Sequence, residues 1–265
     1  MNKGWPSLLW NLYNNDSDQA GSYFGAQEAN RSLHAIYALD NGTVTLDNLS
    51  NTTQSGLSLE AKVYNLAGTV LDDQSAGGIS LASQQVRTSV LTPKVPSSPA
   101  GTYFVELQLK RSGTLADRNV YWLSTQPDVV NWSKTLGQPQ GAVSQYANLT
   151  SLQTLPQSPV TATASTVSQA GPGGADRATT VTITNPSSAT AAFLLRADIR
   201  RGTASGQELP GDSELQSSIW QDNDITLFPG ESQTLTVTWN SADLQGSTPV
   251  VSVSGWNVPT IDIPA

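Results

Sequence analysis

The chain has 265 residues, of which 13% are charged and 37% hydrophobic, and its formal net charge is −8. This acidic balance excludes nucleic acid and anionic membranes as favoured partners, because both repel negative charge. With no cysteine and one histidine, His34, the sequence also excludes disulfides, zinc–thiolate sites and most histidine-based catalysis, and no cofactor is expected. No stretch offers the roughly 18–20 apolar residues that a bilayer requires.

One helix is predicted near the N-terminus, from Asp16 to about Leu33. Asp16 precedes Gln19 by three residues, which is the spacing of a capping box. A stripe on one side of the helix consists of Ala20, Tyr23, Phe24, Gln27 and Ala29. Because no helical partner is predicted, this stripe must face a sheet or something absent. We expect residues 1–33 to dock on the first sandwich or to remain loosely ordered.

From His34 onward the pattern alternates between apolar and polar residues, with turn sequences such as Asn41-Gly42 between the segments. Seven short strands are predicted, which matches an immunoglobulin-like sandwich, and the absence of cysteine excludes a true antibody domain. The predicted strands are residues 34–39, 44–47, 57–64, 69–72, 86–91, 102–110 and 118–123. The single histidine stands where the helix gives way to the first strand, so we expect a structural role for it.

A proline-punctuated stretch follows and predicts an ordered linker, with a short helix or turn in residues 146–155. A second set of seven strands is then predicted at residues 160–165, 179–184, 192–200, 215–220, 225–228, 233–240 and 250–256. The expected fold is mainly β, with two immunoglobulin-like β-sandwiches in tandem preceded by one α-helix. The expected divisions are residues 1–33, 34–125, 126–158 and 159–265.

Acidic residues close in sequence are candidates for paired catalytic carboxylates, which a retaining glycosidase requires. Each such pair has a simpler explanation, as helix N-terminal charge, a strand-end turn or a loop. The pairs are Asp16 with Asp18, Asp72 with Asp73, and Asp222 with Asp224. We assign no catalytic residue. Asp222 and Asp224 are a weak metal candidate, since they lack a full ligand set for calcium.

The seven tryptophans are the candidates for binding carbohydrate, because sugar rings stack on exposed aromatic planes. Trp122, Trp239 and Trp256 lie in alternating strands and are expected in the core. Trp132 and Trp220 lie where a side chain can remain exposed and are the candidate substrate contacts. An autonomous carbohydrate-binding or adhesion module is therefore an open alternative.

The opening stretch WPSLLWNLY, which starts at Trp5, and residues 18–26 together resemble the end of the catalytic (β/α)8 barrel in exo-β-D-glucosaminidases of glycoside hydrolase family 2. The similarity continues through residues 34–40, 61–68, 119–124, 200–203, 222–227 and 251–258, and so spans nearly the whole chain. By this resemblance, residues 1–33 are the last loop and helix of the barrel. The two sandwiches are then the final immunoglobulin-like domains.

The resemblance implies an enzyme that removes glucosamine from the non-reducing end of chitosan oligomers. The family's catalytic carboxylates lie on earlier barrel strands and have no counterpart here, so the chain is expected to be inactive alone. Its implied role is a non-catalytic region that supports the barrel and contacts substrate. The implied partners are the N-terminal and barrel domains of the same enzyme and chitosan oligosaccharides, and the implied location is extracellular, in a bacterium. Trp5 would lie on the active-site rim.

Overall fold

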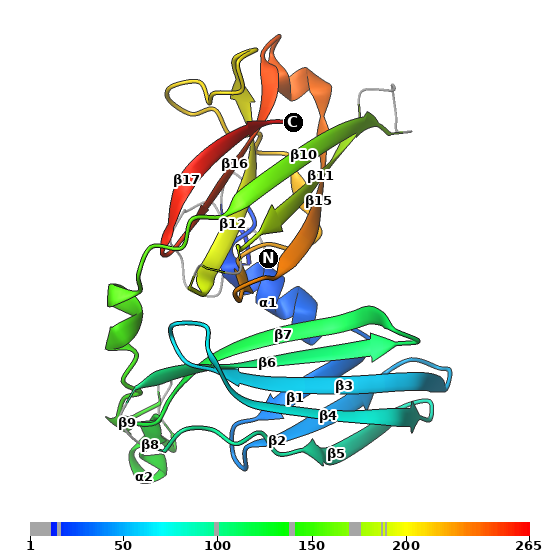
Figure 1. Cartoon of the computed structure of the whole chain (residues 1–265), viewed down its shortest axis with the longest axis vertical. Helices are drawn as coiled ribbons and strands as arrows, with labels where there is room; N and C mark the ends of the chain where they lie inside the picture. Colours follow the sequence, from blue (N-terminus) through cyan, green and yellow to red (C-terminus); the bar gives the residue numbers. More distant parts are fainter. Residues whose placement is uncertain are drawn as a thin grey trace. The chain divides into compact units, whose positions relative to one another are not determined.

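A computed structural model of the chain describes residues 12–14, 17–97, 101–137, 141–169, 176–186, 188 and 190–265. It forms two compact units (Figure 1). One unit comprises Ala29–Leu155, and the other joins the described residues up to Glu28 with Pro156–Ala265. Each unit contains one β-sandwich, so the predicted mainly-β fold with two sandwiches is confirmed. Among the described residues, no helix has the length and apolar character needed to span a membrane.

The sandwich of the first unit consists of two antiparallel sheets with the strand orders β1-β2-β5 and β4-β3-β6-β7. All seven predicted strands are present, and β4 is much longer than expected. Their bounds are β1 (Leu33–Ala38), β2 (Thr43–Asn48), β3 (Gln54–Tyr64), β4 (Val70–Leu81), β5 (Gln85–Leu91), β6 (Thr102–Arg111) and β7 (Thr114–Ser124).

The core of this sandwich follows from the period-two pattern of its central strands. Leu59 and Val63 of β3 lie opposite Leu109 and Val105 of β6, and all four side chains are buried. Successive strand residues point to opposite faces, so each alternating apolar set gathers on the inner face of its sheet. Full burial of each such side chain contributes about 1.5–3 kcal/mol to the free energy of folding. The paired strands β3 and β6 therefore contribute strongly to the stability of this unit.

Asp117 connects the two sheets of this sandwich. It lies on β7, and its carboxylate accepts hydrogen bonds from the Ala35 backbone N–H at 2.8 Å and from Arg31 and Asn119 at 3.0 Å. His34 Nδ1 lies 3.0 Å from the same carboxylate. Because β1 carries His34 and Ala35 and belongs to the other sheet, the buried carboxylate fixes one sheet to the other. The structure therefore places the single histidine in a structural contact.

Substitution Asp117→Asn should lower the free energy of unfolding of this sandwich by about 2–3 kcal/mol, because Arg31 and His34 lose a buried charged partner. Burial alone would raise the pKa of Asp117, but hydrogen bonds from His34, Ala35 and Arg31 leave that pKa below its ordinary value. This stabilisation is present above the ordinary pKa of about 4 and is lost as the pH falls through the lowered one. Urea denaturation at pH 7 and in acid measures both effects, and an equal deficit at all pH values would contradict this role.

The described residues after β7 belong to the first unit as far as Leu155. It contains the small hairpin of β8 (Val129–Val130) and β9 (Val143–Gln145), with α2 (Trp132–Thr135) between the two strands. The 3-10 helix η1 (Thr150–Thr154) lies where a short helix or turn was predicted. The side chain of Asn131 caps α2 by accepting a hydrogen bond from the Lys134 backbone N–H at 3.2 Å.

The second sandwich has the strand orders β10-β11-β15-β13 and β14-β12-β16-β17. Two predictions were wrong: residues 215–218 form a turn before a two-residue β13, and β17 was not predicted. Proline is the second and the last residue of β17, which an edge strand tolerates because the outer N–H groups pair with no neighbour. The strands are β10 (Thr161–Ser168), β11 (Asp176–Thr184), β12 (Ala192–Gly202), β13 (Ile219–Trp220), β14 (Ile225–Leu227), β15 (Ser232–Asn240), β16 (Thr248–Gly255) and β17 (Val258–Pro264).

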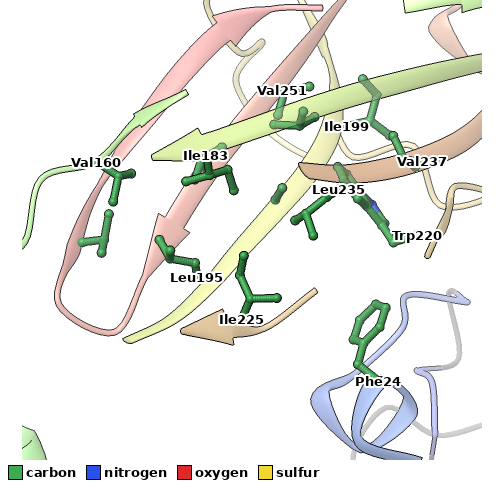
Figure 2. Close-up of a cluster of buried hydrophobic side chains, with 14 of the residues drawn as sticks. Phe24, Val160, Ile183, Leu195, Ile199, Trp220, Ile225, Leu235, Val237 and Val251 are labelled. Atoms are coloured by element: carbon green, nitrogen blue, oxygen red, sulfur yellow. The ribbon is translucent and has the colours of Figure 1, made fainter. Parts of the chain in front are cut away.

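The N-terminal helix α1 (Gly21–Ala29) is shorter than predicted, because Leu33 and His34 already belong to β1. Phe24 of α1 is 2% exposed and is part of the core of the second sandwich. Figure 2 shows its ring pointing toward the strands of that sandwich. The expectation that the N-terminal residues dock on the first sandwich was therefore wrong for this helix. The expectation that its apolar side faces a sheet is confirmed for Tyr23 and Phe24, whereas Gln27 and Ala29 of the predicted stripe are exposed.

Candidate functional site

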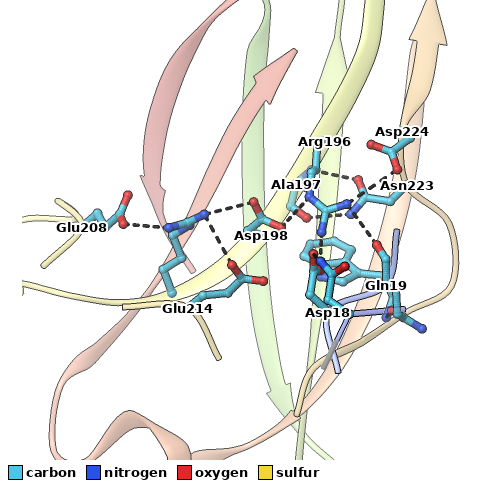
Figure 3. Close-up of polar contacts among 12 residues, drawn as sticks. Asp18, Gln19, Arg196, Ala197, Asp198, Glu208, Glu214, Asn223 and Asp224 are labelled. Atoms are coloured by element: carbon cyan, nitrogen blue, oxygen red, sulfur yellow. Dashed lines mark hydrogen bonds and ion pairs between the residues drawn. The ribbon is translucent and has the colours of Figure 1, made fainter. Parts of the chain in front are cut away.

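Charged and amide side chains gather where the N-terminal segment meets the second sandwich (Figure 3). We call this cluster the junction, and it consists of Asp18, Gln19, Arg196, Asp198, Arg200, Glu208, Glu214, Asn223 and Asp224. Asp18 and Gln19 come just before α1. The alternating charges at 196, 198 and 200 share one face of β12, while Ala197 and Ile199 on its other face are buried in the core. The remaining residues lie on the two loops that follow β12 and precede β14.

Arg196 is the central cation of the junction. Its guanidinium pairs with the carboxylate of Asp18, donates to Gln19 O at 3.1 Å and to Asp198 Oδ1 at 3.1 Å, and lies 3.6 Å from Asp224 Oδ2. Burial would lower the pKa of Arg196, but the charges of Asp198, Asp18 and Asp224 raise it above its ordinary value. One arginine therefore joins the N-terminal segment, β12 and the loop before β14.

Arg200 lies four residues after Arg196 on β12 and contacts the loop that follows this strand. Its Nη1 donates to Glu208 Oε1 at 2.8 Å, and its Nη2 donates to Asp198 Oδ2 at 3.2 Å. The Glu214 carboxylate is more distant, with Oε2 3.7 Å from Nη2. Glu208 also accepts a hydrogen bond from the Ser213 hydroxyl at 2.6 Å. Asp198 is thus shared by two arginines, while among the described residues Glu214 has a single, long contact with a cation.

The junction carries more negative than positive charge, because five carboxylates surround two guanidinium groups. Burial raises the pKa of Glu214 to about 7, and the charges of Asp198 and Asp18 add to this effect, while Arg200 and Arg196 oppose it. Burial also raises the pKa of Asp224, against the charge of Arg196. Glu214 therefore titrates close to neutral pH while the arginines remain charged.

The junction also contains two uncharged amide side chains, Gln19 and Asn223. Gln19 Oε1 accepts a hydrogen bond from the Trp220 backbone N–H at 2.8 Å. Asn223 accepts from the Ala197 N–H and donates to the Ala197 carbonyl, both at 2.8 Å, so its amide pairs with β12 as a neighbouring strand would. Gln19 and Asn223 are buried, and these bonds satisfy backbone groups that would otherwise be unpaired. Gln19 therefore anchors the chain to β13 instead of capping the helix, and its predicted partner Asp16 lies outside the described residues.

Three acidic side chains of the junction, Asp18, Asp198 and Glu214, place ligand atoms within 4.8 Å of one another. Within the described ranges, the predicted metal candidates Asp222 and Asp224 join no such group. Asp222 instead accepts hydrogen bonds from Gln233 at 3.0 Å and from the Asn223 N–H at 2.9 Å. Because Arg196 and Arg200 already contact the acidic trio, the arrangement is a network of ion pairs and we assign no metal to it.

The two described tryptophans that were proposed as substrate contacts differ in exposure. Trp132 is 69% exposed on α2, as expected, whereas Trp220 is 3% exposed and belongs to the core. The exposure predicted for Trp220 was wrong, because the N-terminal segment binds its backbone through Gln19 and places Phe24 in the same core. The third candidate, Trp5, lies outside the described residues.

The tryptophans that were predicted to lie in the core also differ in exposure. Trp239 is buried as expected, and its indole N–H donates to the Thr179 hydroxyl at 2.8 Å. Trp122 and Trp256 are 42% and 58% exposed, so this prediction was wrong for both. Trp122 lies on the edge strand β7, and Trp256 lies in the turn after β16, so neither has sandwich neighbours on all sides.

The junction was not predicted from the sequence, although one signal was present. The pattern Arg196-Ala197-Asp198-Ile199-Arg200 places three charges of alternating sign on one face of a predicted strand. The charged side chains on such a face need oppositely charged or hydrogen-bonding partners from other parts of the chain. Which residues supply them depends on chain segments that lie far away in the sequence.

The fold and the junction define a chain of two β-sandwiches, the second of which incorporates an N-terminal segment. Residues 140–258 match the family model described as the exo-beta-D-glucosaminidase Ig-fold domain. The whole chain is 42% identical to an exo-beta-D-glucosaminidase of Streptomyces avermitilis and 37% identical to one of Amycolatopsis orientalis. The predicted resemblance to exo-β-D-glucosaminidases is thereby confirmed along the chain.

The solved structure of the Amycolatopsis orientalis exo-chitosanase CsxA is also similar to this chain. The match has a TM-score of 0.85 at 36% sequence identity. It covers the whole of this chain and 30% of the length of that protein. The chain covers 28% of the Streptomyces avermitilis relative and 25% of the curated Amycolatopsis orientalis relative. It therefore spans less than a third of the proteins that it resembles.

Proposed function

We propose that the chain is the non-catalytic C-terminal region of a secreted bacterial exo-β-D-glucosaminidase of glycoside hydrolase family 2. In this proposal its second sandwich holds the end of the catalytic barrel in place. The observation that carries the proposal is the position of residues 18–24. They resemble the end of a barrel, yet their contacts are with the second sandwich through Phe24, Gln19 and Arg196.

This role is consistent with the architecture of a (β/α)8 barrel. Its helices form an outer ring, and its active site is built by loops at one end of the strands. A last helix that is fixed to a separate sandwich would resist opening of the barrel without taking part in the chemistry. The contacts of residues 18–24 suit that task, because they combine a buried ring, neutral hydrogen bonds and ion pairs in one place.

Amide hydrogen exchange on the intact chain tests the proposal. Residues 20–29 should exchange slowly, with protection that approaches that of β12 and β15, because all three share one core. Rapid exchange of α1 alongside slow exchange of the strands would contradict a role in holding the barrel.

We expect the purified chain to release no p-nitrophenol from p-nitrophenyl β-D-glucosaminide and no glucosamine from chitosan oligomers. A retaining glycosidase needs two carboxyl groups about 5 Å apart across an open sugar site. The close carboxylates of the junction are instead occupied by Arg196 and Arg200. Turnover that disappears when one carboxylate of this chain is replaced would show that the chain is itself an enzyme.

Trp132 is the proposed contact with chitosan, and its exposure is also the observation that favours an autonomous carbohydrate-binding module. An indole face attracts the ammonium groups of chitosan, an interaction of about 0.5–1 kcal/mol at an exposed site. In titrations with chitosan oligomers, Trp132→Ala should therefore raise Kd by roughly two- to fivefold. Trp256→Ala, which removes another exposed indole, serves as the control. Equal affinities for the two variants would remove Trp132 as a specific contact.

A further inference from the structure

We infer that the junction is a pH-sensitive clasp, in which uptake of one proton by Glu214 strengthens the hold of the second sandwich on residues 18–29. This inference rests on the proposed function, because it concerns the regulation of the same contact. It begins from the arrangement of charge between the N-terminal segment and the sandwich.

Three elements direct charged groups toward Glu214. The N-terminal segment contributes Asp18, which lies within 4.8 Å of both Glu214 and Asp198. Strand β12 contributes Asp198 with its two arginines, and the loop that carries Glu214 also carries Glu208. Asp18 and Glu214 stand on opposite sides of the contact and have the same sign, so their repulsion acts directly against docking of the segment.

The arginines do not neutralise this repulsion completely. Arg196 is shared by Asp18, Asp198 and Asp224, and Arg200 makes its shorter contacts with Glu208 and Asp198. The 3.7 Å separation between Arg200 Nη2 and Glu214 Oε2 is beyond ordinary hydrogen-bond length. Within the described part of the chain, the buried Arg200 Nε also has no hydrogen-bond partner. Glu214 is the carboxylate with the least compensation.

A proton on Glu214 changes this balance in two ways. It removes one of five negative charges, and it turns the carboxyl group into a hydrogen-bond donor beside two carboxylates that only accept. Either Asp198 or Asp18 can receive that bond after a small side-chain rotation, since the ligand atoms of the three residues already lie within 4.8 Å. A bond to Asp18 would link the sandwich directly to the N-terminal segment.

The direction of the pH effect follows from the raised pKa. Glu214 has a pKa of about 7 in the docked structure, against 4.5 for an ordinary glutamate. A group whose pKa is raised by docking contributes stability that is complete below its ordinary pKa and is lost as the pH rises through the raised one. The clasp should therefore be tight near pH 5 and loosen through pH 7. The raised pKa of Asp224 acts in the same direction.

The experiment is amide exchange of residues 20–29 in the full chain between pH 5.5 and 7.5, corrected for the intrinsic dependence of exchange on pH. For wild type, the protection of α1 should fall about tenfold over this range, since one proton changes an equilibrium by at most tenfold per pH unit. Glu214→Gln resembles the protonated form and should remove most of this fall, leaving only the contribution of Asp224. Asp212→Asn, on the same loop but exposed and outside the junction, should retain the wild-type pH dependence.

Protection of β12 and β15 in the same measurement shows whether each variant folds. If wild type lacks pH dependence while α1 is protected, the clasp is refuted but the proposed function stands. The clasp is likewise refuted if a folded Glu214→Gln variant keeps the wild-type dependence. If α1 is unprotected at every pH, both the clasp and the proposed function fail. A Glu214→Gln variant that does not fold would also count against the clasp, since protonation is expected to stabilise the contact.

Discussion

Replacing Phe24 with alanine is expected to release α1 and to lower the free energy of unfolding of the second sandwich by about 3 kcal/mol. Phe→Ala substitutions at buried positions cost about 3–5 kcal/mol. We take the lower end because α1 lies at the edge of the core and can shift to fill part of the cavity. Urea denaturation gives the energy, and amide exchange shows that the loss of protection begins in residues 20–29.

Gln27→Ala is the matched control, because Gln27 is on the same helix but exposed. Alanine favours helix at least as well as glutamine, so stability should change by less than about 0.5 kcal/mol. Comparable losses in the two variants would mean that the core contact of Phe24 does not hold the helix. A large loss of stability without faster amide exchange in α1 would mean that Phe24 stabilises the sandwich but does not hold the helix to it.

The first sandwich was predictable because its information is local. In β3 the residues from Leu57 to Val63 alternate between buried apolar and partly exposed polar side chains, so the burial pattern can be recognised from the alternation of residue types. The turn at Asn41-Gly42 is equally local. Gly42 has a φ of 70°, and the side chain of Asn41 accepts a hydrogen bond from the Thr43 N–H at 3.0 Å.

The second sandwich was less predictable where its strands are short or lie at an edge. Residues 215–218 contain an apolar start that suggests a strand, but Ser218 N–H bonds back to Leu215 O at 3.1 Å and closes a turn. Edge strand β17 begins and ends near proline, which argues against a strand from propensity alone. In both places the neighbouring strand decides the structure, and the local residues do not.

The junction could not be predicted, because its partners are remote in sequence. Asp18 and Arg196 are 178 positions apart, and Gln19 and Trp220 are 201 apart. The capping-box spacing at Gln19 predicted a local bond, but the side chain makes a remote one. The helical stripe correctly indicated that α1 faces a sheet. Nothing within the helix distinguishes the two sandwiches as its partner.

Replacing Arg196 with methionine is expected to weaken docking of the N-terminal segment by about 2–4 kcal/mol at pH 7. Methionine keeps much of the side-chain volume but leaves Asp18, Asp198 and Asp224 without their shared cation. Removing one partner of a mostly buried ionic group costs about 3–5 kcal/mol, and the partial exposure of Arg196 reduces this figure. Urea denaturation and exchange of residues 20–29 measure the loss.

The Arg196→Met deficit should also depend on pH, which distinguishes lost charge from lost packing. Without the guanidinium, the pKa values of the remaining carboxylates rise in the docked state, because burial and mutual repulsion are no longer opposed. Groups with raised pKa values stabilise the docked state at low pH and lose that contribution as the pH rises. The deficit should therefore be largest above pH 7 and shrink toward pH 4. Arg201→Met removes a neighbouring half-buried arginine outside the junction, whose Nη1 donates to Gln245 in an exposed contact, and should cost less than about 1 kcal/mol at any pH. A deficit for Arg196→Met that is constant with pH would mean that its methylene packing, and not its charge, holds the segment.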